Sequence, residues 1–309
     1  MLWESLTASG WYLLRIIPII AASVVLAELL VRLGALERLS FLAGPISRFS
    51  HLSGESGVAL ITAFLSPTAA SAMLRDFYEQ GVIPRRELIV ASLARAFPLI
   101  ISEARYMLPT LLPILGAVGL WYYGTWVGIN LTMTFIACLL GYFLLPRRAL
   151  CSVRQVGADP PLFGRALRES LKESFRTLRR IFMIMVPATV GGFMLADLGV
   201  FEALAKGLSG ISSYLPFPSG GMAVLATYIA SPIASYPLAA KLLAQGVIAA
   251  REVIVIFLLG SILAFPLRLR QLIPHYLGIY GPRPGLELLG LSLGLRSLVT
   301  LAAVVLIIP

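Results

Sequence analysis

The chain has 309 residues, of which 58% are hydrophobic and only 13% are charged. About a quarter of the residues in a typical soluble domain are charged, so this composition, with a mean hydropathy of +0.89, excludes a soluble enzyme, a disordered tail and a disulfide scaffold. The formal net charge of +10 does not indicate nucleic acid as a partner, because the cations lie in loops and at helix ends, where basic residues decide membrane orientation.

Two long stretches lack Asp, Glu, Lys and Arg altogether. Tyr106–Pro146 has 41 residues and Gly207–Ala240 has 34. A bilayer-spanning helix needs about 20 apolar residues, so the first stretch can hold two spans. The sequence therefore predicts an all-α, polytopic membrane helix bundle in the plasma or inner membrane, with the lipid bilayer around it. Two cysteines and two histidines without pattern predict neither a metal site nor a cofactor.

The chain contains an internal sequence repeat. An offset of 165 residues aligns Arg15–Pro109 with Arg180–Pro274 without a gap, with 27 identities in 95 positions. Chance similarity between leucine-rich helices would not keep proline, glycine, glutamine and arginine at a constant offset. We therefore expect a first membrane repeat over 1–146, a basic amphipathic cytoplasmic connector over 147–179 and a second membrane repeat over 180–309.

Each repeat is predicted to contain about five hydrophobic elements. In chain order they are about 11–33, 57–74, 88–102, 106–121 and 124–145, then 181–198, 222–243, 253–267, 271–281 and 286–308. Several are shorter than a full span, so some of them are candidates for half-helices or re-entrant hairpins. Gly290 and Gly294 form a GxxxG pattern in the last element, which is typical of close helix packing or a homodimer contact.

Charge asymmetry predicts how the two repeats are oriented. The connector Arg147–Arg180 has nine basic and three acidic residues, which places it in the cytoplasm. Both termini carry few basic residues and are expected outside. An external start and an internal end require an odd number of crossings in each repeat, so the repeats are expected to have inverted topology. Inverted repeats are typical of secondary transporters.

Matching proline interruptions in the two repeats predict the binding site. Ser66-Pro67 interrupts the second element of the first repeat, and Ser231-Pro232 interrupts its counterpart. Proline breaks a helix, and paired breaks with small and hydroxyl residues indicate a transporter binding site. A structural proline kink is the alternative. The predicted solute contacts are Thr62, Ser66, Pro67, Thr68, Ser71, Thr227, Ser231, Pro232 and Ser235.

A second group of candidates is ionisable. Arg95, Glu103 and Arg105 lie in or between the third and fourth elements, and Arg268 and Arg270 fall in the matching region. Guanidinium groups suit carboxylate or phosphate, so Arg105 and Arg270 are predicted to bind an anionic solute. Glu103 is the candidate for carrying a coupling proton. The alternative is that 103–105 and 268–270 are water-exposed turns whose arginines reach the headgroups.

The two breaks, Ser66-Pro67-Thr68-Ala69 and Ser231-Pro232-Ile233-Ala234, are each followed by an amphipathic helix and a glycine turn. This unit resembles the gate, or nucleoside-recognition, domain family, which includes spore-maturation membrane proteins, the membrane region of the ferrous-iron transporter and concentrative nucleoside carriers. The resemblance implies helix-breaking gates around a central solute path. The chain departs from the iron-transporter pattern, because neither break has a cysteine nearby.

The sequence as a whole predicts a secondary transporter and not an enzyme. Its expected substrate is a small anionic or phosphate-bearing, nucleoside-like solute, bound near the midplane and coupled to H⁺ or Na⁺. Two other classes stay open: a membrane assembly or scaffold factor that transports nothing, and a flippase or enzyme that handles lipid phosphates.

Overall fold

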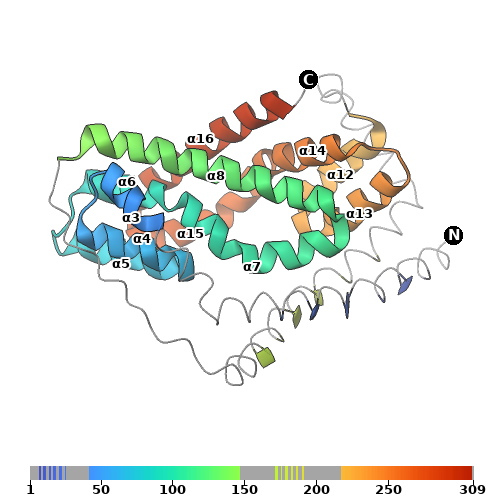
Figure 1. The fold of residues 1–309 in the computed structure, drawn as a ribbon, viewed down its shortest axis with the longest axis horizontal. Coiled ribbons are helices and arrows are strands. Elements are labelled where there is room, and N and C mark those ends of the chain that lie inside the picture. Colours follow the sequence, from blue (N-terminus) through green and yellow to red (C-terminus); the bar gives the residue numbers. More distant parts are fainter. Residues whose placement is uncertain are drawn as a thin grey trace.

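The computed structural model describes residues 42–146 and 217–307 and isolated positions elsewhere, and the side chains of Ser219, Arg270 and Gln271 are not described. All regular structure in these residues is helical (Figure 1). The expected elements at 11–33 and 181–198 and the connector over 147–179 lie outside the two described ranges.

The first repeat contributes six helices to the described ranges and the second contributes five. In chain order they are α3 (Ala43–Phe49), α4 (Gly54–Leu65), α5 (Pro67–Glu79), α6 (Arg85–Ala94), α7 (Ala96–Leu115), α8 (Ala117–Leu144), α12 (Ser219–Ala230), α13 (Pro232–Ala244), α14 (Ala250–Leu263), α15 (Phe265–Tyr280) and α16 (Pro282–Ile307).

Helix boundaries recur at the offset of 165 residues found in the sequence. When 165 is added to their residue numbers, the bounds of α4 and α5 coincide with those of α12 and α13. The first residues of α6 and α8 coincide in the same way with those of α14 and α16. Gly116 and Gly281, which separate the last two helices of each repeat, both have positive φ, 56° and 80°. Only glycine adopts such a turn freely. The two repeats therefore share their local architecture as well as their sequence.

The predicted boundary at residues 103–105 is wrong, because Glu103 and Arg105 lie inside α7. The chain breaks earlier, at Arg95, since Pro98 has no N–H to offer the carbonyl of Ala94. The hydroxyl of Thr134 on α8 donates to that carbonyl at 3.1 Å and accepts from the N–H of Phe97 at 2.9 Å. Both backbone groups at the break are thereby satisfied by one side chain.

The matching boundary in the second repeat is also displaced from its predicted place. The break falls at Ala264, with Pro266 in the first turn of α15, so residues 268–270 are helical. Pro98 and Pro266 are not equivalent positions of the repeat, which explains why this break is the one that does not recur at the common offset. The alternative in which 103–105 and 268–270 form water-exposed turns is therefore wrong.

The helices pack around two apolar clusters. One joins α7 and α8 to α12, α13 and α14 around Tyr122 and Phe257, and the other joins α3, α4, α5 and α6 around Phe64 and Leu88. The long helix α8 extends along both (Figure 1). It thereby connects the packing of the first repeat to that of the second.

Two described helices are long and apolar enough to cross a membrane, α8 with 28 residues and α16 with 26. Only 11% of the apolar window of α16 is buried, so packing within the described residues does not account for its apolar surface. A large exposed apolar surface marks contact with another protein segment or with lipid. Lipid is the surrounding that fits it.

Candidate functional site

Both proline breaks have the same backbone geometry. Ser66 has φ −142° and ψ 98°, and Ser231 has φ −157° and ψ 113°, so each is one extended residue between two helices. Their hydroxyls accept hydrogen bonds from the N–H groups of Ala69 at 3.3 Å and Ala234 at 3.4 Å. A capping serine followed by proline is a favourable helix start. The predicted helix interruptions are thus present in both repeats.

Four of the other five predicted hydroxyls, all except that of Thr68, donate to carbonyls of their own helices. The bonds run from Thr62 to Val58 at 2.9 Å, from Thr227 to Ala223 at 2.8 Å, from Ser71 to Pro67 at 2.8 Å and from Ser235 to Pro232 at 2.6 Å. These are bonds to the carbonyl three or four residues earlier in the same helix, so the hydroxyls have a structural use in both repeats. Of the four, Ser71 also accepts a hydrogen bond from the guanidinium of Arg95.

A cavity of about 510 Å³ lies at the first break, between helices of both repeats. Of the predicted site residues it brings together Pro67, Thr68, Ser71, Glu103 and Arg105. It does not include Thr62, Ser66, Thr227, Ser231, Pro232 or Ser235. The position of the Arg270 side chain lies outside what the structure describes. The sequence thus predicted that both breaks contribute to the site, but only residues of the first break line this cavity.

The described wall of this cavity is strongly cationic. It has four guanidinium groups, those of Arg95, Arg105, Arg268 and Arg296, against the single carboxylate of Glu103. Four positive charges and one negative charge leave a formal excess of +3. Low-dielectric walls strengthen such a field. An anion entering the cavity would therefore be attracted.

The four arginines have different partners. Arg268 and Arg296 are the charges that act on Glu103. Arg296 also donates to Asn130 at 3.3 Å and lies 5.6 Å from the ring centroid of Trp126. The guanidinium of Arg105 lies 4.6 Å from the ring centroid of Tyr106. Asn130, Trp126 and Tyr106 carry no charge, so Glu103 is the one carboxylate among these contacts.

Sequence reasoning missed Arg296, Tyr280 and several serines of the wall. Arg296 is the one charged residue between Glu287 and the end of the 26-residue helix α16, and intramembrane charges often mark a functional path. That signal was sufficient to select it. Tyr280 and the serines gave no such signal, because their types and spacing are ordinary for a helix. The remaining polar lining residues include Ser92, Ser102, Ser261, His275 and Ser292.

At the second break, three repeat positions have aromatic residues where the first repeat has small or polar ones, and a fourth has glycine in place of arginine. The pairs are Ala63 and Tyr228, Ser71 and Tyr236, Ser92 and Phe257, and Arg95 and Gly260. The ring of Phe257 lies 5.3 Å from that of Tyr228 and 5.4 Å from that of Tyr236, and all three side chains are buried. Aromatic packing therefore fills the place that is hollow in the first repeat.

Residues 13–121 match the family model named Gate and described as nucleoside recognition. The resemblance predicted from the breaks is thereby confirmed for the first repeat. The gate match and the apolar helices indicate a membrane protein of a transporter-like kind.

The chain is also similar along almost its whole length to three uncharacterized proteins of Methanocaldococcus jannaschii. MJ1556 is 29% identical over 300 residues, which cover 96% of this chain and 95% of the relative. MJ0871 is 27% identical over 93% of this chain and 90% of its own length, and MJ0880 is 26% identical over 96% and 97%. No solved structure matches the chain significantly.

Proposed function

We propose that the chain is a multi-pass secondary transporter of a small anionic or phosphate-bearing solute, which binds in the cavity beside the first proline break. The observation that carries the proposal is the cavity wall with four arginines and one glutamate. Guanidinium groups form paired, charge-assisted hydrogen bonds with carboxylates and phosphates. A bare metal cation would need an excess of carboxylates, thiolates or imidazoles instead.

The size and lining of the cavity limit the solute. A volume of about 510 Å³ lies within the range of small-molecule sites, and the wall contains serine hydroxyls and aromatic rings besides the arginines. Such a wall suits a solute that combines an anionic group with hydroxyls and a ring. A phosphate-bearing, nucleoside-like solute has this composition, in keeping with the nucleoside recognition in the description of the matched family.

Alternating access by two inverted repeats is the proposed mechanism. Arg85, at the start of α6, pairs with Glu287 in the first turns of α16, and Val90 of α6 contacts Gly141 near the end of α8. The start of α16 therefore lies near the end of α8, and the two equivalent helices run in opposite directions (Figure 1). Opposed directions of repeat-related helices favour inversion of the repeats.

Glu103 is the proposed coupling residue. It lines the cavity and interacts electrostatically with Arg268 and Arg296. Arg268 occupies the repeat position equivalent to Glu103, so the carboxylate and one of its arginines come from corresponding places in the two repeats. A proton on Glu103 would release both arginines for the solute. Na⁺ coupling through the break carbonyls is the other proposal.

A binding and uptake experiment tests the transporter proposal. Purified protein is melted with nucleosides, nucleotides, organic anions, lipid phosphates, Na⁺ or divalent metals, because a ligand of the native state raises its apparent stability. Ligands that shift the melting temperature are then offered to proteoliposomes. We expect a saturable shift with one anionic class and uptake of the same class.

Matched variants show whether the cavity is responsible. Arg105→Ala with Arg268→Ala removes two of its cations, whereas Arg85→Ala removes an arginine that is outside it. The double variant should lose the shift and Arg85→Ala should keep it. A shift with lipid phosphates alone would favour the flippase or enzyme, and no shift in the entire panel would favour the scaffold factor.

A further inference from the structure

We infer that Arg95 holds the anionic group of the solute, at a subsite completed by Ser71, Ser92 and Tyr280, and that each chain has one such subsite. The inference rests on the proposed function and assigns roles within the same cavity. It concerns Arg95 because this arginine, unlike the other three of the wall, contacts the proline break itself.

The guanidinium of Arg95 has only neutral partners among the described residues. Its Nη1 donates to the carbonyl of Pro67 at 2.9 Å and to the hydroxyl of Ser71, and its Nη2 donates to the hydroxyl of Tyr280 at 2.9 Å. Its Nε is buried and has no hydrogen-bond partner in the described part of the chain. A buried N–H without an acceptor is costly. An oxyanion would supply both the missing acceptor and the missing charge.

The other arginines of the wall are less suited to this task. Arg268 and Arg296 interact electrostatically with the Glu103 carboxylate, which offsets part of their charge before any solute arrives. Arg105 also has a buried Nε without a described partner, but its guanidinium lies against the ring of Tyr106 and contacts neither break. Arg95 thus combines an uncompensated charge with a position at the interrupted helix.

The neighbours of Arg95 are arranged to accept an anion without leaving new orphaned groups. The oxygen of Tyr280 accepts from Arg95 and, at 3.4 Å, from Ser92. Neither bond uses the phenolic proton of Tyr280, so this proton can be donated to an oxyanion. If the anion binds Nε and one Nη in the paired geometry that guanidinium favours, Tyr280 can still keep its bond with Ser92. Binding of the anion at Arg95 therefore breaks few of the existing hydrogen bonds.

The second repeat cannot form a second subsite. The residue equivalent to Arg95 is Gly260, and even a Cβ added there would lie 2.5 Å from the Cδ1 of Tyr228. Tyr236 and Phe257 occupy the positions of Ser71 and Ser92, as described above. One anion per chain is the expected stoichiometry.

Calorimetric titration of the purified full chain with inorganic phosphate and with acetate tests the inference. Arg95→Ala should weaken binding of the better anion at least about tenfold, which corresponds to about 1.4 kcal/mol. Arg95→Lys keeps the charge but loses the paired geometry, so its affinity should lie between those of wild type and Arg95→Ala. Arg105→Ala should cause a smaller loss, and Arg85→Ala none.

Arg95 also joins α5 to α15, so a melting curve without ligand must accompany each titration. If Arg95→Ala does not melt cooperatively, the role of Arg95 is tested with Arg95→Lys and Tyr280→Phe instead, because both variants keep a side chain of similar size. Tyr280→Phe should weaken anion binding several-fold, since it removes the phenolic donor. A third titration with a dispersed phosphatidic acid distinguishes a lipid headgroup from a free anion as the source of the phosphate.

The outcomes separate the two proposals. Failure of wild type to bind any of the three probes overturns the anion site as a whole and with it the proposed function. Wild-type binding that is insensitive to Arg95→Lys and Tyr280→Phe, but is lost in Arg105→Ala, overturns only the role of Arg95. A stoichiometry of two anions per chain overturns the single subsite.

Discussion

At the residue scale, Gly260 shows how the repeats have diverged. In the second repeat Tyr228 takes the room that Gly260 leaves, whereas the equivalent positions of the first repeat are Ala63 and Arg95. We predict that Gly260→Ala destabilises the protein by about 1–3 kcal/mol, because the added methyl group meets a buried ring in a packed interior. A thermal or urea melt in detergent measures the loss.

Gly128 of α8 is the matched control, since a Cβ added there has nothing within 4 Å. Alanine is a better helix former than glycine by up to about 1 kcal/mol, so Gly128→Ala should be neutral or slightly stabilising. Equal effects of the two substitutions would show that the contact between Gly260 and Tyr228 does not restrict this position.

Glu103 is the carboxylate of the cavity wall, and its removal tests the charge argument. We predict that Glu103→Gln strengthens equilibrium binding of a phosphate or carboxylate several-fold, because Arg268 and Arg296 then have no competing anion. Net uptake driven by a proton gradient should fall in the same variant. Weaker equilibrium binding would contradict the role of Glu103 as a competing charge and would favour a direct contact with the solute.

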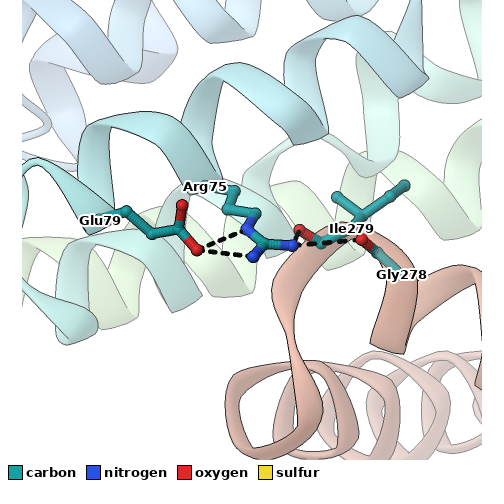
Figure 2. A network of polar contacts seen from close by, with 4 residues as sticks. All are labelled: Arg75, Glu79, Gly278 and Ile279. Atoms are coloured by element: carbon teal, nitrogen blue, oxygen red, sulfur yellow. Dashed lines mark hydrogen bonds and ion pairs between the residues drawn. The ribbon is translucent and has the colours of Figure 1, made fainter.

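At the element scale, Arg75 of α5 caps the C-terminal end of α15 (Figure 2). It donates to the carbonyls of Gly278 at 3.2 Å and Ile279 at 2.7 Å. The Nε and Nη2 atoms of Arg75 bind the carboxylate of Glu79. The carbonyl of Gly278 lacks the usual helical donor because the residue four positions on is Pro282. A cation at a helix C-terminus also meets the negative end of the dipole. Arg75 therefore joins the two repeats beside the cavity.

We predict that Arg75→Ala destabilises the protein by about 1–3 kcal/mol, the range for hydrogen bonds with a charged donor. Faster hydrogen exchange should appear in residues 278–287, where α15 meets α16. Glu79→Gln is the control, since it removes an exposed i,i+4 pair of about 0.5 kcal/mol and leaves the two carbonyl bonds in place. The prediction fails if Glu79→Gln is as damaging as Arg75→Ala.

At the scale of the whole molecule, the proposed inversion of the repeats requires that equivalent turns face opposite sides of the membrane. The turns that follow α5 and α13 lie at opposite ends of the molecule (Figure 1). Val82 and Val247 are equivalent positions in these turns and are 40% and 44% exposed. In a background without Cys138 and Cys151, we predict that Val82→Cys and Val247→Cys react with an impermeant thiol reagent from opposite sides of the membrane.

Inside-out and right-side-out vesicles make this labelling decisive. Each variant should react in one vesicle type and be protected in the other, with the order reversed between the two variants. Reaction of both variants from the same side would contradict inversion and remove the basis for alternating access by the two repeats.

Several features could be predicted from the sequence alone because they depend on local chemistry. The repeat offset follows from identities along the chain, and Ser66-Pro67 and Ser231-Pro232 interrupt their helices because proline lacks a donor and serine caps the next turn. The displaced break at Arg95 could have been found in the same way. The missed signal was Pro98, which deprives the carbonyl of Ala94 of its helical donor.

The location of the cavity could not be predicted in this way, because it depends on which side chains fill the space between helices. The two breaks have nearly the same sequence and backbone, yet Tyr228, Tyr236 and Phe257 fill the second one and Arg95 lies at the first. Which residues far apart in the chain contact each other, such as Arg95 and Tyr280, is decided by helix packing. The sequence by itself determined the repeat and its helix breaks, and the tertiary structure alone decided which break is beside a hollow, because packing volume is a property of residues brought together from both repeats.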